Sequence, residues 1–356
     1  TSIPLKGWKV QANNTLITLP NDTIKTNQYA VLCSTSAVTA LSSYGKAIGV
    51  TSFPSLLNAG MTLKLFDSGG SLISMVNYGD SWYGDDIKKN GGWSLEKIDY
   101  QNLMEGKNNW KASVESNGGT PCTVNSVAST NPDITPPRIL SLEVTSDTTI
   151  KLLFSEPMDS LMLTFTNSYN IDNGVEHPIS ATLHGGNYTE VVLTLSEPIS
   201  SSIKYTLCLN NNLTDFSGNK ISADCMPFTL PQTPAWNDIV VNEVLFNPYT
   251  GGVDFVEIYN RSEKTVDLSK MFISNRNSTT GELDQVYSAS DTSRLLFPGE
   301  YAVITISLRL VKMFYHIENE KAFVNVSKIA SFNIDMGYVV LLNEDLLDID
   351  ELHYNE

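Results

Sequence analysis

The sequence predicts an all-β fold of three sandwich domains in tandem, and three observations support this prediction. Apolar and polar residues alternate, as at Met61, Leu63 and Leu65, in segments bounded by Gly, Asn, Asp and Pro. Alternation with a period of two indicates strands that bury one face. A block of sequence also recurs, and two proline-rich segments divide the 356 residues into thirds. At about 100 to 150 residues per domain, this length suits two or three domains.

The first domain, residues 1–130, has a second copy at residues 236–356. Four segments recur in the same order: Ile3–Val10 with Val266–Ile273, Gln28–Val31 with Glu300–Val303, Leu57–Asp67 with Ile334–Glu344, and Ile73–Tyr78 with Ile349–Tyr354. Such long, ordered recurrence indicates a duplicated domain rather than a short solenoid repeat. Ser34–Tyr44 and its weaker parallel Ser307–Tyr315 predict a short turn of helix between strands.

The two copies differ at their ends. The second copy has opening strands over Ile239–Asn260, before the point that matches Leu5, where the first copy has four residues. Conversely, the first copy continues over Ser81–Asn125, past its match to Glu356. We therefore expect the first domain to lack its first strands and the third to lack its last. Either the chain is a fragment of a longer protein, or strands of another chain complete the open edges.

The middle domain, residues 134–230, lies between two stiff joints. The joints are the proline-containing segments Asn131–Pro137 and Leu230–Pro234, which restrict the chain to extended conformations. The pattern predicts strands over Ile139–Val144, Thr149–Phe154, Glu190–Leu195 and Lys204–Leu209. Their spacing indicates another sandwich of about 95 residues.

Charge and the lack of catalytic motifs limit the function. The net charge of −16 divides into +1 for residues 1–132, −7 for 133–231 and −10 for 232–356. Acidic surfaces repel a polyanion, so nucleic acid is an unfavourable partner. The sequence lacks the metalloprotease His-Glu-x-x-His, the Gly-x-Ser-x-Gly elbow and a phosphate-binding glycine loop. We predict no enzyme activity and no catalytic residues.

One turn-like stretch holds the candidate binding residues. Asp80, Asp85 and Asp86 gather acidic oxygens that suit calcium, although the order lacks EF-hand spacing, and a solvated acidic face is the alternative. Trp82 and Tyr83 between them would form a platform for a sugar ring or a protein, or else pack in the core. A second acidic cluster, Asp345, Asp348, Asp350 and Glu351, is interpreted as a solvated face. No other cofactor is expected.

Cysteine placement predicts one disulfide. Cys208 lies in a predicted strand and Cys225 begins the next, so a hairpin would bring them together. The bond would contribute roughly 3 kcal/mol by restricting the unfolded chain. Cys33 and Cys122 are expected to be separate buried thiols.

The outer copies resemble lamin-tail domains, an immunoglobulin-like module of nuclear lamins and of many bacterial secreted proteins. The resemblance lies in Val241–Pro248, Asp254–Asn260 and Val266–Leu268 of the second copy, and in Leu5–Trp8, Gly92–Ile98, Asn109–Trp110 and Gly119–Pro121 of the first. The middle unit resembles the bacterial Ig-like domains of S-layer proteins through Thr135–Pro137, Phe154–Asp159 and Asp215–Asn219. Together these segments imply three immunoglobulin-like sandwiches.

The resemblance implies a non-catalytic bacterial surface protein that acts as a binding, adhesion or spacer module. Its expected partners are proteins or polysaccharides at the cell surface. The expected location is secreted or outer-surface, with lipid anchoring through an upstream segment as one route. The alternative is an accessory region of a larger extracellular hydrolase, such as a nuclease or phosphatase. A lamin-type structural protein is disfavoured because the sequence has no heptad rod.

Overall fold

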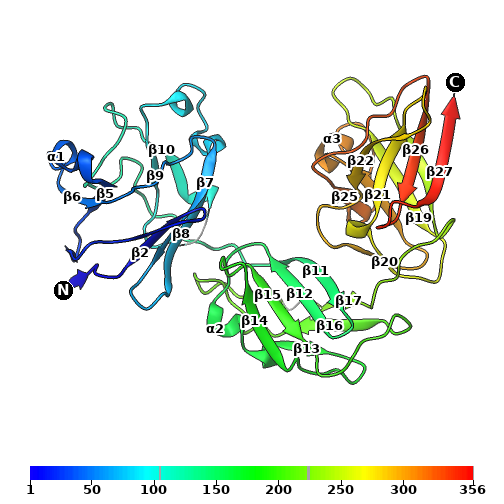
Figure 1. Ribbon diagram of the computed structural model, residues 1–356, viewed down its shortest axis with the longest axis horizontal. Helices are drawn as coiled ribbons and strands as arrows, with labels where there is room; N and C mark the ends of the chain where they lie inside the picture. The colour runs from blue at the N-terminus through cyan, green and yellow to red at the C-terminus, as the bar shows by residue number, and fades with distance from the viewer. Residues whose placement is uncertain (104–105, 223–224, 356) are drawn as a thin grey trace. The chain divides into compact units, whose positions relative to one another are not determined.

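The computed structural model describes residues 1–103, 106–222 and 225–355, and it confirms the all-β class (Figure 1). The α-helices of these residues are four residues long: α1 Val38–Leu41, α2 Ser160–Leu163 and α3 Leu308–Val311. Short 3₁₀ helices connect strands: η1 Thr35–Ala37, η2 Asp80–Tyr83, η3 Lys88–Asn90, η4 Lys107–Asn109, η5 Thr166–Ser168, η6 Leu268–Lys270 and η7 Glu320–Ala322. None of the described helices has the length and apolar composition needed to cross a bilayer.

The chain divides into two compact units. The N-terminal unit is Thr1–Pro136 with Thr214–Asn219, and the C-terminal unit is Pro137–Leu213 with the chain from Lys220 onward. The first contains one sandwich, which we call the N-terminal sandwich. The second contains two, which we call the middle and C-terminal sandwiches.

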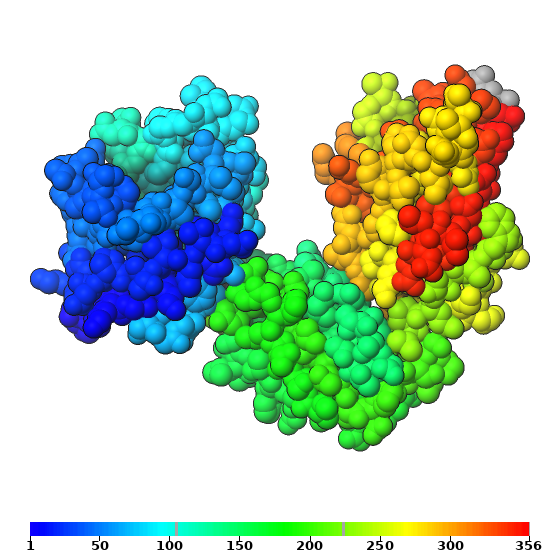
Figure 2. Space-filling view, in the orientation of Figure 1, coloured from blue at the N-terminus to red at the C-terminus, as the bar shows by residue number. Residues whose placement is uncertain are grey.

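The N-terminal sandwich has one four-stranded sheet and several short pairs. The antiparallel sheet is β3-β2-β7-β8, formed by β2 Lys9–Ala12, β3 Thr15–Thr18, β7 Gly60–Phe66 and β8 Leu72–Gly79. The pairs are β1 Ser2–Pro4 with β4 Thr23–Lys25, β5 Ala30–Ser34 with β6 Lys46–Val50, and β9 Leu95–Lys97 with β10 Trp110–Ala112. All three residues of β1 are exposed, and the strand lies at the surface of this unit, dark blue in Figure 2.

Helix α1 follows β5 and packs on β6 because Gly49 leaves room for it. A Cβ atom on Gly49 would lie 2.7 Å from Val38 Cγ2. The predicted helical turns over Ser34–Tyr44 and Ser307–Tyr315 are confirmed by η1 with α1 and by α3.

The middle sandwich places a four-stranded sheet against a three-stranded one. The first, β11-β12-β15-β14, contains β11 Ile139–Ser146, β12 Thr149–Phe154, β14 Ser180–His184 and β15 Glu190–Thr194. The second, β13-β16-β17, contains β13 Tyr169–Ile171, β16 Tyr205–Leu209 and β17 Cys225–Phe228. All four strands predicted here are confirmed. Phe154, Tyr169 and Phe228 are almost fully buried in the shared core.

The C-terminal sandwich contains two four-stranded sheets. One, β18-β19-β24-β25, contains β18 Ile239–Leu245, β19 Phe255–Asn260, β24 Tyr301–Thr305 and β25 Phe323–Asn325. The other, β22-β21-β26-β27, contains β21 Phe272–Arg276, β22 Leu283–Ser288, β26 Met336–Leu342 and β27 Asp348–Asn355. A short pair joins β20 Val266–Asp267 to β23 Leu295–Leu296.

The N- and C-terminal sandwiches share a strand plan. The order β3-β2-β7-β8 matches β22-β21-β26-β27, and the parallel pair β5-β6 matches the parallel pair β24-β25. A tyrosine hydrogen bond also recurs: Tyr78 Oη donates to Leu57 O at 2.9 Å, and Tyr354 Oη donates to Asn333 O at 2.7 Å. The structures of the two copies are therefore equivalent over these strands.

The strand register corrects one detail of the sequence alignment. Val10 pairs with Leu65, whereas the equivalent Ile273 pairs with Leu341. Leu65 therefore corresponds to Leu341, and the alignment of Leu57–Asp67 with Ile334–Glu344 is wrong by one residue. Four consecutive buried apolar residues, 339–342, made the register ambiguous in the sequence because no alternation marks the inner face there.

Candidate binding surfaces

The predicted aromatic pair faces into the N-terminal sandwich. Both Trp82 and Tyr83 belong to η2 and are partly buried. The Trp82 ring lies 6.4 Å from the Trp110 ring, and Tyr83 Oη donates to Trp93 O at 3.0 Å. These contacts indicate that Trp82 packs inside the sandwich. Tyr83 lies at the wall of a cavity.

That cavity has a volume of about 270 Å³ and is mostly apolar. It is lined by Leu56, Leu57, Asn58, Leu63, Val76, Tyr78, Tyr83, Leu95 and Trp110. Leu63 of β7 and Val76 of β8 are cross-strand partners that form part of the lining. The sequence gives no signal of this cavity because its lining comes from segments far apart in the chain.

The carboxylates predicted to hold calcium are engaged separately. Asp85 Oδ1 accepts hydrogen bonds from the main-chain N–H groups of Lys88 and Ile87 at 3.1 and 2.8 Å, which lower the pKa of this carboxyl. Asp86 Oδ1 lies 3.1 Å from Lys89 Nζ. Among the described residues, Asp80 does not join these two in a ligand set with atoms within 4.8 Å of one another. The arrangement fits a capped turn.

The second acidic cluster binds an arginine. Arg276 donates from Nε to Glu351 Oε2 and from Nη2 to Asp348 Oδ2, each at 2.6 Å. The hydrogen bond to Glu351 is the main cause of the raised pKa of Arg276. Asp350 Oδ2 accepts from the main-chain N–H of Val241 at 2.7 Å. These contacts join β27 to β21 and β18, so the cluster is structural rather than only a solvated face.

The turn at the buried Asp215, in the N-terminal unit, makes contacts to Asp133 that the sequence did not predict. Asp215 Oδ1 accepts from the N–H groups of Ser217 and Asn219 at 2.8 and 2.9 Å. Asn219 Nδ2 and Ser217 Oγ donate to the main-chain oxygen and to Oδ2 of Asp133, at 3.2 and 3.1 Å. The sequence signal was the run Asp215–Asn219, whose Asp, Gly and Asn favour a tight turn. This turn fastens the segment around Asp133.

A disulfide joins Cys208 of β16 to Cys225 of β17, with Cα atoms 4.1 Å apart. The two residues are direct cross-strand partners, which brings their side chains to the same face. The thiol of Cys33 is buried and that of Cys122 is partly buried.

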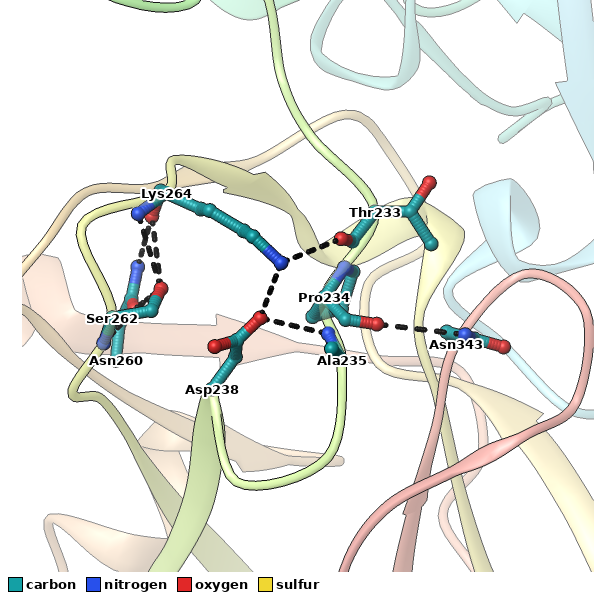
Figure 3. Close-up of polar contacts among 8 residues, drawn as sticks. All are labelled: Thr233, Pro234, Ala235, Asp238, Asn260, Ser262, Lys264 and Asn343. Atoms are coloured by element: carbon teal, nitrogen blue, oxygen red, sulfur yellow. Dashed lines mark hydrogen bonds and ion pairs between the residues drawn. The ribbon is translucent and has the colours of Figure 1, made fainter.

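The joint before the C-terminal sandwich is held by polar contacts (Figure 3). Lys264 Nζ lies 2.7 Å from Asp238 Oδ2 and donates to Thr233 O at 3.4 Å. The same Asp238 oxygen accepts from Ala235 N at 2.8 Å, and Asn343 Nδ2 donates to Pro234 O at 3.5 Å. Burial acts to raise the pKa of Asp238, but the hydrogen bonds from Lys264 and Ala235, together with the positive charge of Lys264, outweigh it and lower the pKa.

Comparisons with solved structures find distant likenesses. The crystal structure of the N-terminal part of the bacterial S-layer protein SbsC is 15% identical, with a TM-score of 0.25, over 47% of this chain and 45% of that chain. The structure of rSbsC(31–844) is 11% identical, with a TM-score of 0.25, over 62% and 41%. Native α2-macroglobulin from Escherichia coli, domains MG0-NIE-MG1, is 12% identical, with a TM-score of 0.23, over 62% and 87%. The chain thus spans less than half the length of these S-layer structures.

A comparison with curated proteins gives no match. The family model described as Bacterial Ig-like domain matches residues 122–230, and the one described as Lamin Tail Domain matches residues 232–355. The first match covers the middle sandwich together with residues 122–136 of the N-terminal unit, and the second covers the C-terminal sandwich. The chain therefore contains a bacterial Ig-like domain at residues 122–230 followed by a lamin tail domain at residues 232–355.

Proposed function

We propose that this chain is a non-catalytic spacer and binding module of an exported bacterial surface protein. The proposal rests on the joint before the C-terminal sandwich, which side-chain contacts hold in place. Lys264, Asp238 and Asn343 of the lamin tail domain hold residues 233–235 in place, so the chain enters the domain along a fixed path. A module that sets the spacing of its neighbours needs such a joint.

Contacts within the C-terminal unit add to the joint. Ser293 Oγ lies 3.0 Å from Leu142 O and 2.7 Å from the buried Asp267 Oδ2. The ammonium of Lys204 lies 4.2 Å from the centre of the Phe297 ring, within the range of a cation–π contact. Both contacts link the Ig-like domain to the lamin tail domain.

The disulfide between Cys208 and Cys225 supports export. Disulfides persist in oxidising compartments and are rare in the cytosol, where thioredoxin and glutathione keep thiols reduced. Antibodies against this chain should therefore label intact cells that produce the protein. Labelling seen only after lysis would contradict the location.

The spacer role predicts a single separation between the two domains. Spin labels at the exposed Thr182 and Ser278, in a Cys33→Ser, Cys122→Ser background, should give one narrow distance distribution by pulsed electron resonance. Lys264→Ala should broaden this distribution, because the variant removes the contacts of Lys264 Nζ with Asp238 Oδ2 and with Thr233 O.

The matched control is Lys312→Ala, which removes the ion pair with Glu320 elsewhere in the lamin tail domain and should leave the distribution narrow. A broad distribution in the unmodified chain would overturn the spacer role. Turnover of a nucleic acid, ester or phosphate substrate by the purified chain would instead favour a hydrolase region.

A further inference from the structure

The outer face of the sheet β18-β19-β24-β25 carries a cavity of about 410 Å³. Val256 and Ile258 of β19 lie in the core at 0% exposure. Because side chains alternate along a strand, their neighbours in β19 face outward. One row of direct cross-strand partners crosses all four strands and lines the cavity: Glu243, Glu257, Val303 and Phe323. We call this space the Glu257 cavity.

Aromatic rings border the Glu257 cavity. Tyr301 of β24 is 47% exposed, and its ring lies 4.5 Å from the ring of Tyr259. Tyr315, which follows α3, meets Phe255 edge to face with ring centres 6.3 Å apart. Tyr301, Tyr315 and Phe255 all belong to the lining. The faces of such rings attract cations.

Three carboxylates line the Glu257 cavity, those of Glu243, Glu257 and Glu318. No ion pair in the described part of the chain includes any of them, and no lysine or arginine is among the described lining residues. Glu257 Oε1 accepts a hydrogen bond from the neutral Asn242 Nδ2 at 2.6 Å. Glu243 and Glu257 are direct cross-strand partners, and like charges in such positions destabilise a sheet. A bound cation would remove this repulsion.

The other sheet of the same domain shows how two carboxylates are neutralised. There the single guanidinium of Arg276 donates to Glu351 and to Asp348, each at 2.6 Å. A guanidinium suits this task because its planar fork binds carboxylates through several N–H groups and also stacks on aromatic rings. An ammonium is a compact charge without that planar fork. The combination of paired carboxylates and rings therefore favours arginine.

We propose that the Glu257 cavity binds an arginine side chain of a partner polypeptide. The guanidinium lies between Glu243 and Glu257 and against the ring of Tyr301. The net charge of −10 over residues 232–356 also attracts a basic partner. This inference rests on the binding role proposed above and gives that role a partner class. It uses no residue of the joint at 233–235, so the distance measurement can fail while the binding measurement succeeds, and the reverse.

The probe is the peptide Gly-Ser-Arg-Ser-Gly with blocked ends, titrated into the full chain and followed by nuclear magnetic resonance. It should cause saturable shifts at the main-chain amides of Glu257 and Val303. The matched control peptide carries citrulline in place of arginine, which keeps the shape of the side chain and removes its charge. The citrulline peptide should cause no saturable shift. A peptide with lysine should bind more weakly than the one with arginine, because it lacks the planar fork.

Variants test the carboxylates and the ring separately. Glu243→Gln with Glu257→Gln should weaken binding by about tenfold or more, because hydrogen bonds to charged groups are lost. Glu263→Gln with Glu282→Gln is the matched control, since it removes the same charge from exposed positions outside the cavity and should leave binding unchanged. Tyr301→Ala should also weaken binding while all carboxylates remain. Circular dichroism should show that every variant stays folded, because the altered side chains lie outside the core.

Four results would overturn the proposal. One is the absence of saturable shifts with the arginine peptide. Another is equal weakening by the two double variants, which would mean attraction to the acidic surface as a whole. A third is equal binding of the lysine peptide, which would make the site one for any cation. The last is saturable binding of a neutral oligosaccharide, cellohexaose, that survives Glu243→Gln with Glu257→Gln and is lost in Tyr301→Ala, because the cavity would then be a sugar site.

Discussion

Glu96 shows how a single buried carboxylate ties distant segments together. It lies in β9 at 4% exposure, and its Oε2 accepts from N and Oγ of Ser126, each at 2.7 Å. Its Oε1 accepts from Thr120 Oγ1 at 2.7 Å. Burial acts to raise the pKa of Glu96, but these hydrogen bonds together outweigh it and lower the pKa. The folded state therefore favours the ionised form.

Glu96→Gln should destabilise the N-terminal unit by about 2 kcal/mol, since hydrogen bonds to a charged group are lost or inverted. Because the folded pKa lies below the unfolded value of about 4.3, the carboxylate stabilises the fold above that pH. This stability is lost as the pH falls through the folded pKa. Urea unfolding at pH 7 and at pH 3 would measure both effects.

The matched control is Glu115→Gln, because the Glu115 carboxylate accepts from the adjacent Ser116. It should cost under about 0.5 kcal/mol. An equal loss in the two variants, or a Glu96→Gln loss that persists undiminished at pH 3, would contradict the assigned role.

The sequence did not predict the role of Glu96, although the segment around Glu96 carried a recognisable motif. Ser94 and Leu95 beside it carried the resemblance to a known strand. Its partners Thr120 and Ser126 lie 24 and 30 residues away, in loops without any period. For Trp82 and Tyr83 the sequence left an exposed platform and core packing both open, and the contacts of Trp82 with Trp110 and of Tyr83 with Trp93 favour packing.

At the scale of elements, strands with clear alternation were predicted well, whereas short ones were missed. Thr149–Phe154 is recovered with its bounds because Ile150, Leu152 and Phe154 alternate strictly. β13 and β20, of three and two residues, are too short to show a period. These two strands form only because they pair with β16 and β23, and the sequence pattern does not show which strands pair.

The disulfide between β16 and β17 gives a prediction at this scale. Reduction should lower the Tm of the middle sandwich by about 10 °C or more, since a loop of this length contributes roughly 3 kcal/mol. Calorimetry with and without dithiothreitol measures the shift. The double variant Cys208→Ser, Cys225→Ser should melt like the reduced chain.

Thiol titration supplies the control. The unfolded, unreduced chain should contain two reactive thiols, Cys33 and Cys122, and the reduced chain four. In the Cys122→Ser variant, reduction should still lower the Tm of the middle sandwich by the same amount. Four thiols without reduction would show that the bond is not formed.

For the whole molecule, the three sandwiches differ in the size of their cores. The buried clusters of the described residues contain 21 residues in the middle sandwich, 18 in the C-terminal one and five in the N-terminal one. Because apolar burial is the main favourable term in folding, the middle sandwich should be the most stable and the N-terminal sandwich the least.

The N-terminal unit should therefore unfold first on heating. Calorimetry should resolve a first transition, and hydrogen exchange followed by mass spectrometry should assign it to residues 1–130. Reduction should leave that first transition unchanged, because its cysteines carry no disulfide. Residues 1–130 exchanging last among the three sandwiches would contradict this ranking.

The tyrosine hydrogen bond that recurs in the two copies makes the chain its own thermodynamic reference. Tyr78→Phe and Tyr354→Phe delete the same bond across the same 21-residue span, once beside an open cavity and once beneath a stacked Phe246. Everything common to the pair cancels in the comparison, including the chemistry of the deletion. The difference between the two losses measures, within one molecule, how much a covering strand strengthens a hydrogen bond by keeping water from it.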